Sequence, residues 1–220
     1  MTMAYLTGLV AARQVNIKAL AGFLALALLI NAKQAVTIWM RTASKERIVP
    51  GMVFGFHILS ASVLLYPLYN DFGLLQLLPY AAFPAAYLLS LLFLGEHAIA
   101  TEVLGFILLS LAALVAKAIV GSGLDGSLFV VVAVFFVTGV FRVRIQFKKE
   151  LRYRMVMFCY VGASVWFFYL MGYRVLLLLP FVDNIVFALT LYRVGLQTTG
   201  WIEMAKGFVF LLFMAAFGYR

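Results

Sequence analysis

The chain has 220 residues, of which 66% are hydrophobic and only 11% are charged, and its formal net charge is +9. An ordinary soluble domain carries about 25% charged residues, so this composition excludes that class and predicts a multi-pass membrane protein. The positive charge does not indicate nucleic-acid binding, because the basic residues lie in connections between apolar segments. No polar linker interrupts the sequence, and we expect residues 1–220 to form a single transmembrane domain.

The apolar segments follow one another closely along the chain. A short stretch comes first, residues 4–12, which we interpret as a half-helix or a remnant that cannot span a bilayer alone. Eight longer segments are predicted to span as helices: 18–40, 49–69, 72–95, 97–120, 126–144, 152–172, 174–192 and 200–219. They are too long for barrel strands and do not alternate in polarity. The predicted fold class is therefore all-α, a polytopic integral membrane bundle of about eight or nine transmembrane helices.

Basic residues cluster in alternate connections. The connections 41–49 and 142–154 hold more than half of the Lys and Arg residues, whereas 69–73 and 121–127 hold none. The positive-inside rule places the basic loops on the cytoplasmic side of a cell membrane. There they can contact anionic membrane lipids, and they are the predicted docking surface for any partner subunits.

Several short motifs occur twice in the same order. "MVFGFHILSASV" at 52–63 resembles "MVMFCYVGASV" at 155–165, with Tyr160 in the place of His57. "KER" pairs with "KEL", "LLPY" with "LLPF", and "EVLGF" with "EMAKGF". Matches in register favour an internal duplication, with repeats at about 18–120 and 126–220. Four helices per repeat give both halves the same orientation, which predicts a ligand cavity at the interface between them.

Two parallel four-helix halves with basic loops after their first helices resemble the UbiA-type prenyltransferase superfamily. Over about residues 20–220, "LLINAKQAVTIWMR", "ATEVLGFILLSLAA", "GVFRVR" and "YRVGLQTTGWIEMAKGFVF" are similar to YwiC-like membrane proteins. The chain lacks the Arg-Glu-His-Gly-Ala-Trp-like segment with which those proteins usually begin. It also lacks the Asp-rich motifs of the superfamily, whose positions hold Lys33, Arg41, Arg142 and Arg144. The resemblance implies the scaffold and a lipid cavity, without the usual magnesium-binding carboxylates.

Four functions are compatible with this pattern. The first is a non-catalytic membrane subunit that holds a quinone or isoprenoid lipid, or anchors a partner complex such as a respiratory one. The second is a metal-independent prenyltransferase-like enzyme in which the four cations bind a diphosphate. The third is a membrane anchor with haem b held by His57 and His97. The fourth is a small-solute transporter, for which Pro79 and Pro180 are the matched helix interruptions.

Polar residues within or at the ends of the apolar segments are costly there and are the candidate ligand residues. They are Asn31, Lys33, Arg41, His57, Glu102, Arg142, Arg144, Tyr160, Asp183, Glu203 and Lys206. Asp183 has two interpretations, a functional acid or an acid paired with a Lys or Arg of a neighbouring helix. Glu203 and Lys206 have the i, i+3 spacing of a helical ion pair. No catalytic constellation and no metal-ligand cluster is predicted.

Overall fold

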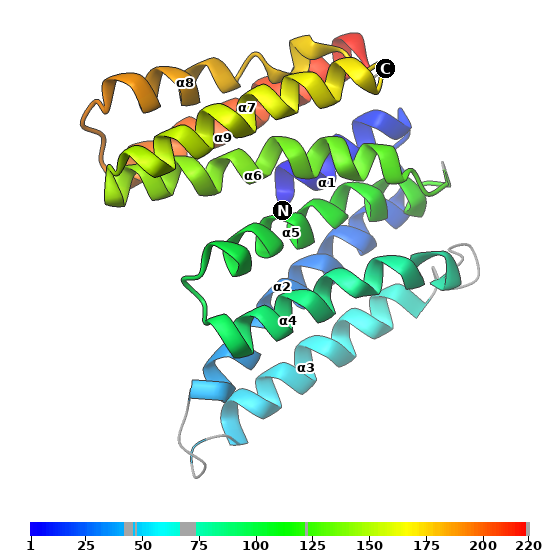
Figure 1. Ribbon diagram of the computed structural model, residues 1–220. Coiled ribbons are helices and arrows are strands. Elements are labelled where there is room, and N and C mark those ends of the chain that lie inside the picture. The colour runs from blue at the N-terminus through cyan, green and yellow to red at the C-terminus, as the bar shows by residue number, and fades with distance from the viewer. Residues whose placement is uncertain (42–45, 47, 67–73, 122, 219–220) are drawn as a thin grey trace.

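The computed structural model describes residues 1–41, 46, 48–66, 74–121 and 123–218, and within these it is all-α (Figure 1). Its α-helices are α1 (Thr2–Ala12), α2 (Ile17–Arg41), α3 (Ile48–Leu65), α4 (Ala82–Leu94), α5 (Ile99–Ile119), α6 (Gly126–Lys148), α7 (Leu151–Leu170), α8 (Phe181–Thr190) and α9 (Leu196–Phe217). Six of them, α2, α3, α5, α6, α7 and α9, are long and apolar enough to cross a membrane. The prediction of a multi-pass, all-helical membrane protein is confirmed to this extent.

Two of the predicted spans are not continuous α-helices. The segment predicted at 72–95 contains the 3₁₀-helix η3 (Leu74–Ala81) followed by α4, and the one at 174–192 contains η4 (Val175–Leu178) followed by α8. Pro79 lies inside η3, and Pro180 is the N-cap of α8. Proline lacks an N–H and its ring clashes with the preceding turn, so an α-helix cannot continue through it unbroken. Both predicted helices therefore begin as 3₁₀ turns and continue as shorter α-helices.

Large apolar side chains cover the outer surface of the bundle. Among the most exposed are Phe56, Phe93, Trp166, Tyr169 and Trp201. A surface of this kind is not tolerated in water and indicates contact with lipid. The core, by contrast, is built around α6, most of which is buried inside the protein.

The helix connections separate into two ends. The connections α4–α5, α6–α7 and α8–α9 lie together on the left of Figure 1, and the connections α1–α2 and α5–α6 lie on the right. Lys148, Lys149, Arg152 and Arg193 belong to the left end, which we call the basic end. This grouping agrees with the predicted sidedness of the basic segments. Of the predicted loop 41–49, residues 42–45 and 47 lie outside the described residues.

The segment 142–154 is not a loop, contrary to the sequence prediction. Helix α6 continues to Lys148 and α7 begins at Leu151, so the connection is very short. Within this helix Arg142 is fully buried and ion-paired, and the pairing offsets part of the cost of placing its charge inside the bundle. Only the outer part of this segment remains available as a docking surface.

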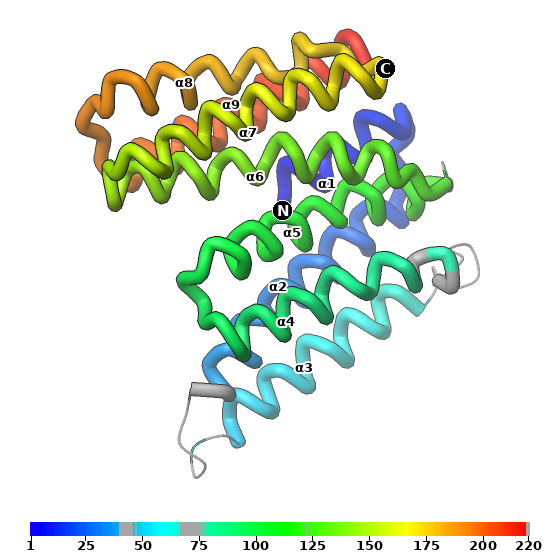
Figure 2. The backbone as a smooth tube through the Cα atoms, in the orientation of Figure 1, coloured from blue at the N-terminus to red at the C-terminus, as the bar shows by residue number. Residues whose placement is uncertain are grey.

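The short helix α1 lies between the two halves of the chain (Figure 2). It packs against α5, α6 and α9, and the Tyr5 hydroxyl donates a hydrogen bond of 2.6 Å to the carbonyl oxygen of Ala19. Gly8 permits the close approach, since a Cβ there would lie only 2.2 Å from the carbonyl oxygen of Ala113. Sequence reasoning placed the ligand cavity at this interface; in the structure α1 lies there, and the cavities described below lie elsewhere.

Candidate functional site

The first half of the chain has a partly open apolar cavity between α2, α4 and α5. Its volume is about 460 Å³, and its walls include Leu29, Leu88 and Leu109. Phe54 of α3 closes one side. Cavities of a few hundred Å³ with mainly apolar walls are typical of sites for small ligands. We call this space the apolar cavity.

A second cavity of about 530 Å³ adjoins it and reaches the basic end at His97. The two cavities share Lys33, Tyr87, Gly105 and Leu109 as lining residues. The ammonium group of Lys33 lies 4.5 Å from the centre of the Tyr87 ring. Within the described part of the chain, Lys33 has no carboxylate partner. We call this space the polar cavity. Together, the apolar cavity and the polar cavity form a mainly apolar space with the cationic side chain of Lys33 where they adjoin.

An ion pair closes the rim of the polar cavity. Arg144 of α6 binds Glu102 of α5 through two contacts of 2.8 Å, from Nε and from one terminal nitrogen. The same guanidinium donates to the carbonyl oxygen of His97. Two-pronged pairing of this kind is both strong and geometrically specific. It holds the α4–α5 connection against α6 and fixes the shape of the cavity mouth.

In the second half, charged side chains are gathered inside the bundle. Arg142 of α6 contacts Asp183 of α8 and lies 3.5 Å from Glu203 of α9. Lys206 contacts Glu203 and lies 3.5 Å from Asp183. We call Arg142, Asp183, Glu203 and Lys206 the charged quartet. Two positive and two negative charges balance, which is the condition under which buried ions are tolerated.

Neutral groups complete the surroundings of the quartet. The Asn184 side-chain oxygen accepts a hydrogen bond of 2.5 Å from Lys206. The Tyr192 hydroxyl accepts one of 2.8 Å from Arg142 and donates one of 3.0 Å to Asp183. The break at Pro180 makes this arrangement possible, because it starts α8 inside the bundle and places Asp183 and Asn184 in the first turn.

The structure brings some predicted candidates together and separates others. The ion pair that the spacing of Glu203 and Lys206 predicts is present, and Asp183 is paired with an arginine of a neighbouring helix. Asn31 is exposed, and the side chain of Arg41 lies outside the described part.

The remaining candidates are the two histidines and Tyr160. His57 Nδ1 lies 2.6 Å from the carbonyl oxygen of Val53 in its own helix, and His57 lines none of the cavities described here. His97 lines the polar cavity. The Tyr160 hydroxyl donates a 2.8 Å hydrogen bond to the carbonyl oxygen of Val134. The two histidines therefore share no described cavity.

Sequence reasoning missed Tyr87, Gly105, Asn184 and Tyr192. Asn184 carried a signal, since it follows Asp183 directly inside an apolar run. Gly105 belongs to the repeated motif that contains Glu102, but its role depends on the space that it leaves. The two tyrosines had no signal, because aromatic residues are common throughout membrane helices.

Within the described residues, no group of three or more His, Cys, Asp or Glu side chains is placed to hold a metal ion. Comparisons of the chain with protein-family models, with curated proteins and with solved structures gave no match.

Proposed function

We propose that this protein is a non-catalytic integral membrane subunit that holds an amphipathic lipid in the joined cavities of its first half. The observation behind the proposal is that the apolar cavity and the polar cavity are adjacent and share the lining residues Lys33, Tyr87 and Gly105. An apolar tail suits the leucine-lined chamber; because the tail is already out of water in a bilayer, its affinity depends on van der Waals packing and on the polar contacts of the head group.

The polar cavity favours a head group that accepts hydrogen bonds. Lys33 offers a cation without a carboxylate partner among the described residues, whereas Glu102 is neutralised by Arg144. A quinone carbonyl or the oxygen of an isoprenoid lipid has the matching chemistry. Tyr87 adds a flat aromatic face beside the same position.

A duplicated, UbiA-like scaffold with two parallel four-helix repeats accounts for the difference between the halves. In the repeat, "EVLGF" pairs with "EMAKGF", so Glu102 corresponds to Glu203 and Gly105 to Gly207, and the second half has one additional residue, which we place at Lys206. A Cβ at Gly105 would lie in contact with the Tyr87 ring, at 3.5 Å, whereas the inserted Lys206 belongs to the charged quartet of the second half. The first half thus has a cavity beside Gly105, and the second half has the ion pairs of the charged quartet near Glu203.

The alternative of a metal-independent prenyltransferase has less support. It requires Lys33, Arg41, Arg142 and Arg144 to bind a diphosphate together. Arg142 and Arg144 each contact carboxylates from neighbouring helices, and this neutralises the charge that a diphosphate needs. Haem b would require His57 and His97 to face the same space, and the two histidines share none of the cavities described here. This alternative therefore also has less support.

Filling the cavity tests the proposal. Gly105→Leu places a side chain against Tyr87 in the wall common to both cavities, and we expect the amount of co-purified lipid to fall at least about fivefold. The measurement is mass spectrometry of an organic extract of the purified protein. Gly55→Leu is the matched control, because a Cβ at Gly55 meets nothing within 4 Å. Equal lipid content in the two variants, or no stoichiometric lipid in the wild type, would contradict the proposal.

The basic end is the proposed cytoplasmic face and the docking surface for a partner complex. In a Cys159→Ala background, we expect Arg152→Cys to react with a membrane-impermeant maleimide only after cells are permeabilised. Gln14→Cys lies at the opposite end, in the connection between α1 and α2, and we expect it to react in intact cells. Labelling of Arg152→Cys in intact cells, with labelling of Gln14→Cys only after permeabilisation, would show that the protein has the opposite orientation.

A further inference from the structure

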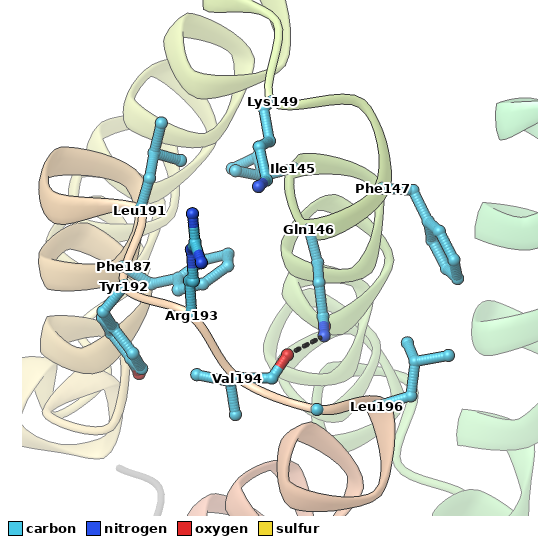
Figure 3. Close-up of a pocket in the computed structure, with 11 residues that line it drawn as sticks. Ile145, Gln146, Phe147, Lys149, Phe187, Leu191, Tyr192, Arg193, Val194 and Leu196 are labelled. Atoms are coloured by element: carbon cyan, nitrogen blue, oxygen red, sulfur yellow. Dashed lines mark hydrogen bonds between the residues drawn. The ribbon is translucent and has the colours of Figure 1, made fainter.

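A third cavity, which none of the candidate functions uses, lies at the basic end of the second half (Figure 3). Its volume is about 350 Å³, and it lies between the last turn of α6 and the connection from α8 to α9. Lys149 and Arg193 line it from opposite walls and extend toward the same space in Figure 3. Among the described residues that line it there is no Asp or Glu. We call it the basic cavity.

The two cations of the basic cavity are not neutralised by the protein. Within the described ranges, neither Lys149 nor Arg193 has an ion-pair partner. The nearest acid in the sequence, Glu150, is paired with Arg152 at 2.6 Å and does not line the cavity. Two positive charges that face one concave space attract an anion, and a guanidinium suits the oxygens of a phosphate group in particular.

The walls of the basic cavity are held in place by hydrogen bonds. The Gln146 amide donates one of 2.7 Å to the carbonyl oxygen of Val194, as Figure 3 shows. Its oxygen accepts one of 2.8 Å from Thr199. The connection between α8 and α9 is thereby tied to α6, so Arg193 is presented on a fixed backbone. A site that is formed before its ligand arrives loses less entropy on binding.

The backbone at this cavity is unusual in two places. Lys149 and Leu191 both have positive φ angles, 48° and 49°, a region that non-glycine residues rarely adopt. Each is the C-cap of a helix, and each donates its N–H to a carbonyl four residues earlier, at Ile145 and Phe187. Glycine is the usual residue at such a cap. Arg13, the C-cap of α1, has the same conformation, so at Lys149 the positive φ angle places the lysine at the cavity wall and is not by itself a sign of function.

The rim of the basic cavity is apolar and faces the lipid. Phe147 and Leu196 line it, with 65% and 56% of their surface exposed. The uncapped N-terminus of α9 at Gly195 adds the positive end of a long helix to the same wall. A lipid lying at the membrane surface can therefore place its phosphate between the cations and its chains against the rim.

We propose that the basic cavity binds a terminal phosphate group, whose two negative charges match Lys149 and Arg193. This site is separate from the lipid cavity of the first half and does not depend on the proposed function. The phosphate can belong to a phosphatidic-acid head group or to free phosphate, which share the chemistry. The apolar rim favours the lipid.

The test is a titration of the purified protein in detergent with dioctanoyl phosphatidic acid, dioctanoyl phosphatidylcholine and inorganic phosphate, followed by native mass spectrometry. We expect saturable binding of phosphatidic acid, and no competition by phosphatidylcholine, whose phosphate carries a compensating cation. Weak competition by inorganic phosphate identifies a lipid site. Inorganic phosphate that binds as tightly as the lipid identifies the free anion as the ligand and also supports the proposed chemistry.

Variants assign the binding to these residues. We expect Lys149→Gln and Arg193→Gln each to weaken binding about tenfold, the effect of one lost charge-assisted contact. The control is the double variant Arg13→Gln/Arg174→Gln, which removes two positive charges at the end of the bundle opposite the basic end. We expect its affinity for phosphatidic acid to equal that of the wild type. If Lys149→Gln/Arg193→Gln binds phosphatidic acid like the wild type, or if the control loses binding equally, the proposal is wrong.

One further variant separates binding from folding. Lys149→Gly removes the cation and also removes the cost of a positive φ angle at the C-cap of α6. We expect this variant to melt at a higher temperature than the wild type while its affinity for phosphatidic acid falls about tenfold. Unchanged affinity in this well-folded variant would overturn the assignment of Lys149.

Discussion

Arg142→Met is expected to lower the free energy of unfolding by about 3–5 kcal/mol, because it removes one partner of a buried charge network. Arg142 is 0% exposed, and its guanidinium contacts Asp183 and Tyr192. After the substitution, the two carboxylates of the charged quartet face only the single cation Lys206. One negative charge is then uncompensated beside the buried part of the network, and this imbalance causes the loss; the side chains of Asp183 and Glu203 are themselves partly exposed, at 32% and 29%.

The measurement is unfolding of the purified protein in mixed micelles by a denaturing detergent. Arg152→Met is the matched control, since Arg152 pairs with Glu150 but its side chain is 66% exposed. We expect the control to change stability by at most about 1 kcal/mol, as is usual for surface ion pairs. Similar losses in the two variants would show that burial of the quartet is not what makes Arg142 important.

A second substitution in the same network checks the role of charge balance. Asp183→Asn on the Arg142→Met background leaves Lys206 and Glu203 as a balanced ion pair with its contact intact. We expect the double variant to recover a large part of the stability lost in the single variant, because the uncompensated negative charge is gone. Additive losses from the two substitutions would contradict this account.

The sequence was most informative about elements that depend on local pattern. Apolar run lengths predicted the positions of the long helices, and the spacing of Glu203 and Lys206 predicted their ion pair. Both follow from helix geometry alone. The alternation of basic and uncharged connections likewise predicted which connections share an end of the bundle.

The sequence was less informative where three-dimensional packing decides. Pro79 and Pro180 were recognised as a matched pair, but the 3₁₀ turns before α4 and α8 were not foreseen. A proline shows where a helix is interrupted and not how the chain continues. The predicted helix 126–144 ends four residues before α6 does, because the basic residues from 142 to 154 were also assigned to a connection. The burial of Arg142 and Arg144 depends on acids about forty residues away, Asp183 and Glu102.

The place of the ligand cavity could not be predicted for a similar reason. A cavity is defined by side chains that do not fill a space, and Gly105 beside Tyr87 becomes significant only once α4 and α5 are packed. The expected cavity between the halves was based on the parallel repeat, and the segment 4–12 was expected to be a remnant or a half-helix. In the structure α1 occupies that interface, and Gly8 is what lets it approach α5.

Gly8→Leu is therefore expected to displace α1 and to lower stability by about 3 kcal/mol or more, the upper part of the range for overpacked cores. A Cβ at Gly8 would lie 2.2 Å from the carbonyl oxygen of Ala113 and 2.8 Å from the Cβ of Ala116. Neither atom is the end of a flexible side chain, so the backbone of α1 must move. Gly55→Leu, in open surroundings, is the control and is expected to be close to neutral.

Displacement of α1 can be measured separately from stability. Thr7 is fully buried next to Gly8, and a cysteine has nearly the same volume. In a Cys159→Ala background, we expect Thr7→Cys to react slowly with N-ethylmaleimide and to react at least about tenfold faster when Gly8→Leu is added, because opening of the interface exposes the thiol. A buried, slowly reacting thiol in the double variant would mean that α5 and not α1 yields to the added side chain, and that α1 is fixed at the interface more firmly than its length suggests.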